Sequence, residues 1–422
     1  MKILLIAYEF PPILAAQALR WFYLSNELVK IGVEVEVICP NIYSENTFPV
    51  EMDERIKLHR VWPGPFIGLS QELGRRLRGK DKVSQGKISS KSSLAFSGYR
   101  MLRSILDNIF YPDVRSEWYP FALRKMKKLL KSRRFDAVVS SYEPGVDIFI
   151  GYHAHIFNIP WTIDMADPLL TPYSPRWRRG LDLRVERKAI LTAKSIIVTA
   201  PSVLDLLKER HGRDITRKFS IVPQGFSDRQ VAAQCLKNTS SFDLIFTGNF
   251  YKDFRNPCEL AKALEMLQDL NISFTIAGNN SEFESYFKNI NRVNFLGQRS
   301  HFDCLNLQGT ADLLVNIGNV QNYQIPGKIY EYLGARKPIL HIKTGTGSDI
   351  GADLIQSTGA GFVVDNNAED IQKILRDIYR QWINDPEELI NNRKEEIIET
   401  NSWSHRAKMY KESLQKMIEE KS

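Results

Sequence analysis

Pro326, Gly327 and Lys328 stand directly before an amphipathic run that carries Glu331. Proline suits the first position of a helix and glycine lets a ligand approach the main chain, so the amides of the opening turn could face a phosphate. Arg255 follows another apolar segment and would add a second cation. Two cations for a diphosphate and a carboxylate for ribose hydroxyls are the chemistry of a sugar-nucleotide site. Each residue alone is typical of a solvated surface, and only their occurrence together favours this function.

Carboxylates follow two earlier apolar segments. Asp164 and Asp167 lie in "IPWTIDMADP", and Glu143 lies in "SYEPG". Asp164 and Asp167 could contact the sugar of a donor or a hydroxyl of an acceptor, and Glu143 is a further candidate. The structural alternative is that both aspartates cap the next segment and hold the turn before Pro168.

The candidate residues must be positioned by the strands and helices of the chain, and these alternate along the sequence. "KILLIAY" reads as a buried strand, "RWFYLSNELVKIG" places Trp21, Leu24 and Leu28 on one helical face, and "VEVEVICP" reads as the next strand. Strand, helix and strand with short connections predict a parallel sheet. The same alternation resumes after "FSIVPQGFSD", and the last segment predicts a lone helix.

We therefore expect an α/β protein with two doubly wound, Rossmann-like domains that face each other across a cleft. Ligands of such sheets bind beyond the carboxyl ends of the strands. The expected parts are residues 1–215, residues 216–403 and a C-terminal helix, 404–422, that crosses back toward the first part.

Positive charge is concentrated in one segment of the 422 residues. The whole chain has a net charge of +8, whereas residues 66–134 hold 17 Lys and Arg against 5 Asp and Glu. Such a segment can meet nucleic acid, an anionic membrane or a phosphorylated substrate, or be a solvated face. It lacks the regular aromatic residues of a nucleic-acid stacking platform, so no nucleic acid is expected. The densest cluster is Arg75, Arg76, Arg78, Lys80 and Lys82, with Phe66 and Leu69 just before it.

No apolar run reaches the roughly 20 residues of a membrane span, and the first residues lead straight into a strand without a signal-peptide cleavage site. We expect a cytoplasmic protein, with peripheral attachment to the inner membrane face as one interpretation of the basic segment.

Metal and disulfide chemistry are not predicted. The cysteines at 39, 235, 258 and 304 show no C-x-x-C spacing, and buried free thiols are the simpler interpretation. His153 and His155 fall in a predicted helix, where their spacing does not bring them to one face, and we interpret them as structural. No metal and no cofactor are expected.

The sequence resembles the family 4 glycosyltransferases of the GT-B fold over nearly its whole length. The segments that carry the resemblance are "YEFPP", "IPWTIDMADP", "AKSIIVTAPSV", "IVPQGFSD", "FTGNFYKDFRNP", "VNFLGQ" and "IPGKIYEYLGARKPIL". The last is the most specific, because it is shared within a branch that acts on cell-surface polysaccharide precursors. The resemblance implies a retaining, metal-independent enzyme that moves a sugar from a UDP-, GDP- or dTDP-sugar to a glycan or lipid-linked acceptor.

The resemblance also implies residue roles, with the acceptor in the N-terminal domain and the donor in the C-terminal domain. The implied catalytic residues are Arg255, Lys328, Glu331 and Asp167. The implied donor-binding residues are Gly248, Asn249, Arg255, Gly297, Gln298, Tyr323, Gly327, Lys328, Ile329 and Glu331. The implied acceptor-binding residues are Ala15, Ala16, Arg20, Glu143 and Asp164.

Several positions depart from the family pattern. Tyr323 stands where many members have the first glutamate of a pair, and Ala15 and Ala16 replace the usual glycines. Asn249 and Ala166 stand where relatives commonly have arginine. The changes at Tyr323, Ala166, Ala15 and Ala16 motivate one alternative, a nucleotide-sugar-binding protein with impaired catalysis. A sugar-nucleotide epimerase on the same fold is a second alternative, although the acidic and histidine motifs that it would require are not found. An NAD enzyme is not favoured, because no G-x-G-x-x-G follows the first strand.

Overall fold

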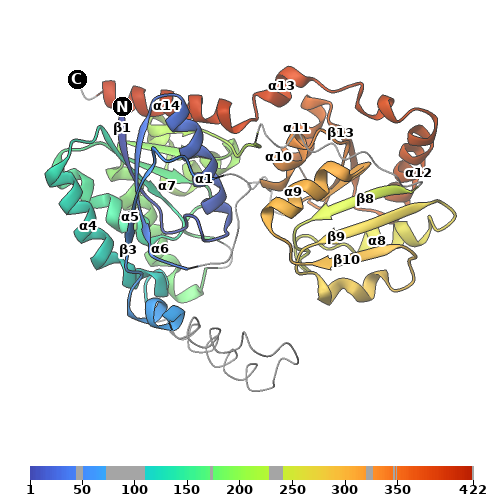
Figure 1. Cartoon of the computed structure of the whole chain (residues 1–422), viewed down its shortest axis with the longest axis horizontal. Coiled ribbons are helices and arrows are strands. Elements are labelled where there is room, and N and C mark those ends of the chain that lie inside the picture. The colour runs from blue at the N-terminus through green and yellow to red at the C-terminus, as the bar shows by residue number, and fades with distance from the viewer. Residues whose placement is uncertain are drawn as a thin grey trace.

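The structure is a computed structural model that describes residues 1–43, 51–72, 110–171, 174–227, 241–319, 327–345, 347 and 349–420. These residues form two parallel sheets, which Figure 1 shows side by side. The first sheet has the order β3-β2-β1-β4-β5-β6-β7 and the second the order β10-β9-β8-β11-β12-β13. The predicted α/β fold class, with two doubly wound domains, is confirmed.

The first sheet is built from short, buried strands. They are β1 (Lys2–Ile6), β2 (Glu34–Pro40), β3 (Lys57–Val61), β4 (Ala137–Ser141), β5 (Trp161–Met165), β6 (Ser195–Val198) and β7 (Phe219–Ile221). The central strand β1 pairs in parallel with β2 and with β4, starting at Lys2 against Glu34 and at Ile3 against Ala137. The strand is continuously apolar because helices cover both faces of the sheet. Strand β7 pairs with β6, so this sheet extends beyond the expected boundary at residue 215.

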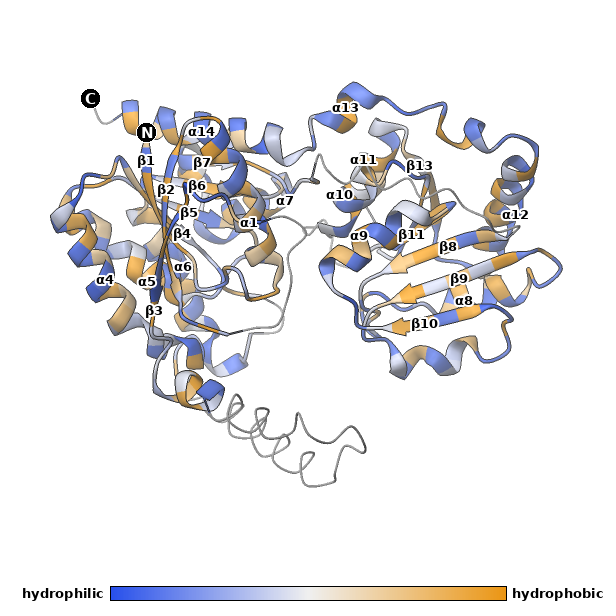
Figure 2. Ribbon diagram, viewed as in Figure 1, coloured by the Kyte–Doolittle hydropathy of each residue, from blue (hydrophilic) through white to orange (hydrophobic). Residues whose placement is uncertain are grey.

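The second sheet repeats this plan. Its strands are β8 (Phe242–Thr247), β9 (Ile272–Ala277), β10 (Val293–Gly297), β11 (Leu313–Ile317), β12 (Ile339–Lys343) and β13 (Gly361–Asp365). Figure 2 shows the apolar colouring of β8, β9 and β10 where they pack against helices. Because all pairings are parallel, the polar residues that follow the strands gather at one edge of each sheet.

Helices cover the two faces of each sheet. In the first half they are α1 (Ala16–Lys30), α4 (Tyr119–Ser132), α5 (Val146–Gly151), α6 (Arg179–Thr192) and α7 (Pro201–His211), with the short 3-10 helices η1 (Val114–Trp118) and η2 (Tyr152–Phe157). In the second half they are α8 (Cys258–Glu265), α9 (His301–Thr310), α10 (Gly327–Gly334), α11 (Ile350–Thr358), α12 (Ala368–Asn384) and α13 (Glu395–Glu399). Among the helices described, none combines the length and apolar character that crossing a bilayer requires.

The last helix, α14 (Trp403–Glu419), returns to the first sheet and packs beside α1 (Figure 1). The ring of Tyr410 meets that of Trp21 edge to face at 5.8 Å, and Lys411 Nζ donates to the carbonyl of Ile31. The predicted crossing of the C-terminal helix is therefore confirmed.

The chain passes between the two sheets at two places that lie side by side. The first is residues 222–227, and the second is residues 401–403. The Phe226 amide donates to the carbonyl of Asn401 at 3.1 Å, and the Trp403 amide donates to the carbonyl of Phe226 at 2.9 Å. Arg406 on α14 also donates to the carbonyl of Gln224 at 3.1 Å.

Glu36 on β2 is a buried carboxylate with three basic partners. Lys2 Nζ lies 2.9 Å, His59 Nε2 2.8 Å and an Arg133 nitrogen 2.7 Å from its oxygens. Burial works to raise the pKa of Glu36, but hydrogen bonds from these partners outweigh it and lower the pKa to about 2. The ionised carboxylate thus stabilises the fold above the ordinary glutamate pKa of about 4.3, and this stability is lost as pH falls toward about 2.

Glu36→Gln should reduce the free energy of unfolding at pH 7 by about 1–3 kcal/mol and flatten its decline below pH of about 4.3. Urea unfolding at a series of pH values measures both effects. Glu34→Gln, on the same strand but exposed, is the control and should change little. An acid decline in Glu36→Gln as steep as in the wild type would contradict the assignment.

Candidate functional site

A cavity of about 550 Å³ lies where the carboxyl ends of the two sets of strands face each other. This is the position at which sheets of this topology bind ligands. The predicted site residues that line the cavity are Ala15, Ala16, Arg20, Glu143, Asp167, Asn249, Gly327, Lys328 and Glu331. The structure therefore brings together residues that are more than 300 positions apart in the sequence.

Lys328 and Glu331 form an ion pair in the first turn of α10. Lys328 Nζ donates to Glu331 Oε2 at 3.1 Å, and the two residues are three positions apart on one helix face. Burial opposes the charge on each group, but their mutual attraction wins, so the pKa of Lys328 is raised and that of Glu331 is lowered. Both groups are charged at neutral pH, and the lysine is available at the cavity wall for an anionic ligand.

The carboxylate of Glu331 is held in place by polar residues that were not predicted from the sequence. Gln308 on α9 donates to Glu331 Oε2 at 3.1 Å and to Thr247 Oγ1 at 2.9 Å. The hydroxyl of Tyr332 accepts from the Thr247 amide at 2.9 Å. Gln308, Thr247 and Tyr332 are almost fully buried. This network fixes the carboxylate of Glu331 relative to the end of strand β8.

His301 is a second missed residue, and it connects the two halves of the cavity. Its Nε2 lies 3.1 Å from the hydroxyl of Tyr23 on α1, and its Nδ1 lies 4.0 Å from Glu331 Oε1. Burial lowers the pKa of His301, so the ring is neutral at pH 7. The sequence offers one signal for this position: Ser300 is a typical N-cap residue, and in the structure its hydroxyl accepts from the Asp303 amide at the start of α9. His301 is therefore the first residue of that helix.

Arg255 lies beside the cavity rather than in its wall. Its guanidinium donates to Asn319 Oδ1 at 2.7 Å and to the carbonyl of Asn249 at 3.5 Å, and both asparagines line the cavity. Its Nε has no hydrogen-bond partner among the described residues. Burial lowers the pKa of Arg255 from a value so high that the group stays charged. The arginine is a cation held at the rim.

The loops after β8 and β9 each contain a glycine in the left-handed region of φ. Gly248 has φ of 139° and Gly278, after β9, has φ of 151°. A Cβ on Gly278 would lie 1.9 Å from the carbonyl oxygen of Gly248, so no other residue fits there. The close approach lets Asn249 Oδ1 accept from the Asn279 amide at 2.9 Å, and this contact holds the Asn249 side chain.

Arg20 and Asp164 bind each other in the first half. The Arg20 guanidinium makes two 2.9 Å hydrogen bonds to the Asp164 carboxylate, and both side chains are fully buried. Arg20 also donates to the carbonyls of Val222 and Pro223 at 3.0 and 3.1 Å. The pair ties α1 and β5 to the first crossing between the sheets, and the predicted contact of either residue with an acceptor stays a prediction.

Glu143 and Asp167 form a carboxyl pair across the cavity from α10. They follow the neighbouring strands β4 and β5, and their side chains are hydrogen-bonded. Burial and the nearby charge of Asp167 together raise the pKa of Glu143 to about 8. At neutral pH the pair therefore shares one proton, which Glu143 holds.

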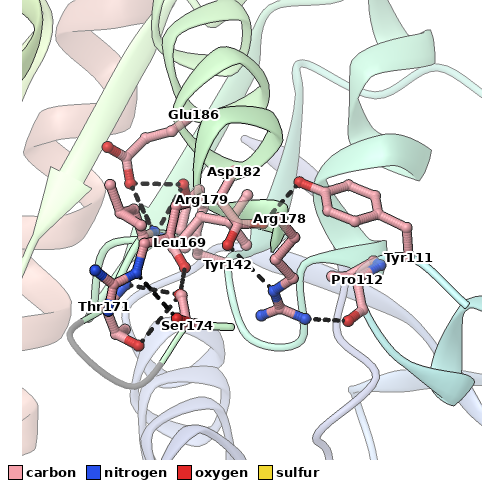
Figure 3. A network of polar contacts seen from close by, with 11 residues as sticks. Tyr111, Pro112, Tyr142, Leu169, Thr171, Ser174, Arg178, Arg179, Asp182 and Glu186 are labelled. Atoms are coloured by element: carbon pink, nitrogen blue, oxygen red, sulfur yellow. Dashed lines mark hydrogen bonds and ion pairs between the residues drawn. The ribbon is translucent and has the colours of Figure 1, made fainter. Parts of the chain in front are cut away.

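A buried network fixes the loop that follows Asp167 (Figure 3). Glu186 on α6 accepts from the amides of Leu169 and Leu170 at 2.8 and 3.3 Å and contacts His211 Nε2 at 2.8 Å. Arg178 contacts Asp182 at 3.2 Å. Glu186 thus ties the chain that follows β5 to α6.

The other predicted site residues lie elsewhere. Gly248, Gly297, Gln298 and Asp164 are not among the lining residues, whereas Arg299, in the loop directly after β10, and His301, at the start of α9, are. The Ile329 side chain is buried in the core between the second sheet and α10. Tyr323 lies outside the described residues. Within the described part of the chain, no group of three or more His, Cys, Asp or Glu could hold a metal ion.

Comparison with known proteins supports this architecture. A model of the "Glycosyl transferase 4-like domain" matches residues 17–223, and one of "Glycosyl transferases group 1" matches residues 228–396. No curated protein matches the sequence significantly.

Solved structures match over the full length at low identity. Sucrose-phosphate synthase from Thermosynechococcus elongatus superposes with a TM-score of 0.66 at 14% identity, covering 100% of both chains. WaaG, a glycosyltransferase involved in lipopolysaccharide biosynthesis, superposes with a TM-score of 0.54 at 13% identity, covering 99% of this chain and 98% of its own. A protein of Listeria monocytogenes that is provisionally named a UDP-N-acetylglucosamine 2-epimerase superposes with a TM-score of 0.54 at 12% identity, covering 99% of this chain and 97% of its own.

Two facing Rossmann-like domains with a cavity between their strand ends define the GT-B class of proteins. The two family models together span most of the chain, and it belongs to the family 4 glycosyltransferases. The resemblance to family 4 glycosyltransferases of the GT-B fold is confirmed.

Proposed function

We propose that this protein transfers a sugar from a nucleotide-sugar donor to a glycan or lipid-linked acceptor in the synthesis of a cell-surface polysaccharide. The observation that carries the proposal is that one cavity has charged side chains from both halves of the protein in its walls. Lys328 and Glu331 lie on one wall, and Glu143 and Asp167 lie on the other.

The donor diphosphate lies against α10 in this proposal. Lys328, Arg255 and the amides of the first helical turn stabilise charge that develops on the leaving nucleoside diphosphate. Glu331 accepts hydrogen bonds from ribose hydroxyls, and its own position is fixed by Gln308. These side chains perform the charge stabilisation themselves, which is the basis for proposing metal-independent transfer. Retention of configuration is proposed from the family resemblance, and it requires that the acceptor hydroxyl attack the anomeric carbon from the face of the sugar that the diphosphate leaves.

The acceptor hydroxyl approaches from the first half. Asp167 accepts its proton as the new glycosidic bond forms, and the protonated Glu143 orients Asp167 by donating a hydrogen bond to it. Ala15 and Ala16 line the same part of the cavity, where their small side chains leave room for the acceptor. Arg20 and Asp164 hold this wall through their ion pair, and a contact of either residue with the acceptor remains part of the proposal.

A panel of UDP-, GDP- and dTDP-sugars tests this function. A donor at 100 times its dissociation constant adds about 2.7 kcal/mol to the stability of the folded state, and the melting temperature reports it. Turnover of the stabilising donor separates the proposed enzyme from a catalytically impaired binding protein. Sugar transfer separates it from an epimerase, which would change the sugar without releasing the nucleotide.

Glu331→Ala should weaken the binding of a free nucleoside diphosphate by about tenfold to a hundredfold, because hydrogen bonds to a charged group contribute about 1.5–3 kcal/mol. Binding of inorganic pyrophosphate should not weaken, since it has no ribose and Lys328 remains. Calorimetric titration of both ligands measures the difference. Equal losses for the two ligands would contradict the ribose contact.

We further propose a cytoplasmic location with peripheral attachment to the inner membrane face. The cluster at Arg75, Arg76, Arg78, Lys80 and Lys82 lies outside the described residues. In the described part of the basic segment, Leu69 is 67% exposed, and the outer face of α4 is rich in lysine. Co-sedimentation with anionic vesicles at low salt tests this attachment, and absence of binding would reject it in favour of a soluble acceptor.

A further inference from the structure

A second cavity of about 450 Å³ lies in the first half, among η1, the start of α4, α5, η2 and α6. It shares no lining residue with the site cavity. Its walls are mainly aromatic and aliphatic, with contributions from Tyr111, Phe149, Tyr152 and Val185. The volume lies within the range of about 300–1,000 Å³ that small-molecule sites occupy. An apolar cavity of this size offers a place for a hydrocarbon chain.

Two nitrogen-bearing side chains belong to the lining. Lys188 on α6 is exposed, with its Nζ 4.7 Å from the centre of the Tyr152 ring. His153 Nε2 lies 2.7 Å from the Tyr119 hydroxyl, whereas its Nδ1 is buried without a hydrogen-bond partner in the described part of the structure. The cavity thus combines apolar walls with a cation and an unsatisfied polar atom, and an amphiphile would match both.

Positive charge continues from this cavity along α4. Tyr119 also lines a shallow groove beside it, together with Arg124, Lys127, Lys128 and Lys131. The charge of Lys127 is close enough to lower the pKa of His153, after the larger effect of burial. Neither lining contains an Asp or Glu among its described residues. Figure 2 shows that α4 carries both apolar and hydrophilic positions.

We propose that this cavity binds one hydrocarbon chain of an anionic membrane phospholipid, with the phosphate held by Lys188 and the basic face of α4. Charge complementarity selects an anionic head group, and the apolar walls select a chain over a free phosphate ion, which they cannot solvate. The site rests on the membrane attachment proposed above and does not require that the protein transfer sugar.

Dodecyl phosphate below its micelle concentration is the first probe. Val185→Trp fills the cavity, and Leu183→Trp is its matched control, since Leu183 is on the same helix but exposed and outside the lining. We expect Val185→Trp to weaken binding at least about tenfold and the control to leave it unchanged. Lys188→Gln removes an exposed cation without touching the core, and Arg187→Gln is its control. Lys188→Gln should weaken binding by about tenfold or more, because it loses a charge-assisted contact, whereas Arg187→Gln should leave binding unchanged.

Two further experiments test whether the ligand needs a hydrocarbon chain and whether it comes from a membrane. Inorganic phosphate should not bind measurably, and binding as tight as that of dodecyl phosphate would overturn the chain site. Equal binding of dodecyl phosphate to the wild type and to both Val185→Trp and Lys188→Gln would overturn it as well. Vesicles of phosphatidylcholine with phosphatidylglycerol should bind the wild type more tightly than Val185→Trp. Binding of the monomer but not of vesicles would overturn the membrane lipid as occupant.

The same variants separate this inference from sugar transfer. Val185→Trp and Lys188→Gln should keep the thermal stabilisation by the nucleotide-sugar that stabilises the wild type, because the two cavities share no residue. Loss of lipid binding with intact donor binding therefore reports on the second cavity alone, and failure of every nucleotide-sugar would leave the lipid result standing.

Discussion

Lys328→Ala is expected to lower kcat by about 100- to 1,000-fold, the usual effect of removing one preorganised group that stabilises developing negative charge. Lys328 is the cation that lines the cavity at the first turn of α10, 3.1 Å from Glu331. Steady-state release of the nucleoside diphosphate from the stabilising donor measures the effect. The melting temperature of the unliganded variant should stay close to that of the wild type.

Arg255→Ala should have an effect of similar size, because Asn319 and the Asn249 carbonyl hold its guanidinium at the cavity rim. Lys252→Ala is the control: it removes a cation from the same loop, but its side chain is 62% exposed and pairs with Glu282. Wild-type rates in both Lys328→Ala and Arg255→Ala would reject the diphosphate clamp. A rate loss in Lys252→Ala as large as in Arg255→Ala would show that the loop, rather than the clamp, was disturbed.

Asp167→Asn should lower kcat by about 100- to 10,000-fold if Asp167 accepts the proton of the acceptor, the range typical of general base catalysis. Glu143→Gln should remain active, because the amide can donate the same hydrogen bond to Asp167 that protonated Glu143 donates. Comparison of the two isosteric variants therefore separates the base from the group that orients it.

The pH profile gives a second measurement on the same pair. Glu143 has a pKa of about 8, so the wild type should lose activity as pH rises through about 8 and the pair loses its shared proton. Glu143→Gln cannot lose that proton, and its profile should stay level across this range. An unchanged alkaline decline in Glu143→Gln would assign the decline to another group.

Linkage predicts the corresponding change in stability. The folded state of the wild type binds more protons at Glu143 than the unfolded state does between the ordinary glutamate pKa and about 8. The free energy of unfolding must therefore fall as pH rises through this window. Glu143→Gln should remove this part of the decline, which pH-dependent unfolding would detect without any substrate.

Local patterns in the sequence were sufficient to predict that certain site residues lie close together. Lys328 and Glu331 are three residues apart on one helix, so helical geometry alone places them together. Glu143 and Asp167 follow successive strands that pair in parallel, and the strand ends meet at one edge of the sheet. The placement of both pairs follows from short-range periodicity and the topology of parallel sheets, whereas their roles in binding and catalysis came from the family resemblance and stay predictions.

Contacts between distant segments could not be predicted in the same way. Arg20 and Asp164 were both predicted as acceptor contacts, and no local pattern indicated that these residues, 144 positions apart, bind each other. His301 meets Tyr23 only after the two halves are placed side by side, and Gln308 reaches Glu331 from another helix. No helical or strand period relates such residues, because the tertiary packing of complete elements decides the pairing.

The two neighbouring crossings between the sheets have a mechanical consequence. A single flexible linker would let the two halves twist and slide as well as bend. Here residues 222–227 and residues 401–403 are joined by main-chain hydrogen bonds through Phe226, and Arg20 and Arg406 fasten the first crossing to α1 and α14. Two chain segments that are bonded together resist twisting more than a single linker does, so we expect the halves to move mainly by bending about the line through these segments. We therefore expect the walls that carry Lys328 and Asp167 to separate and return to the same alignment.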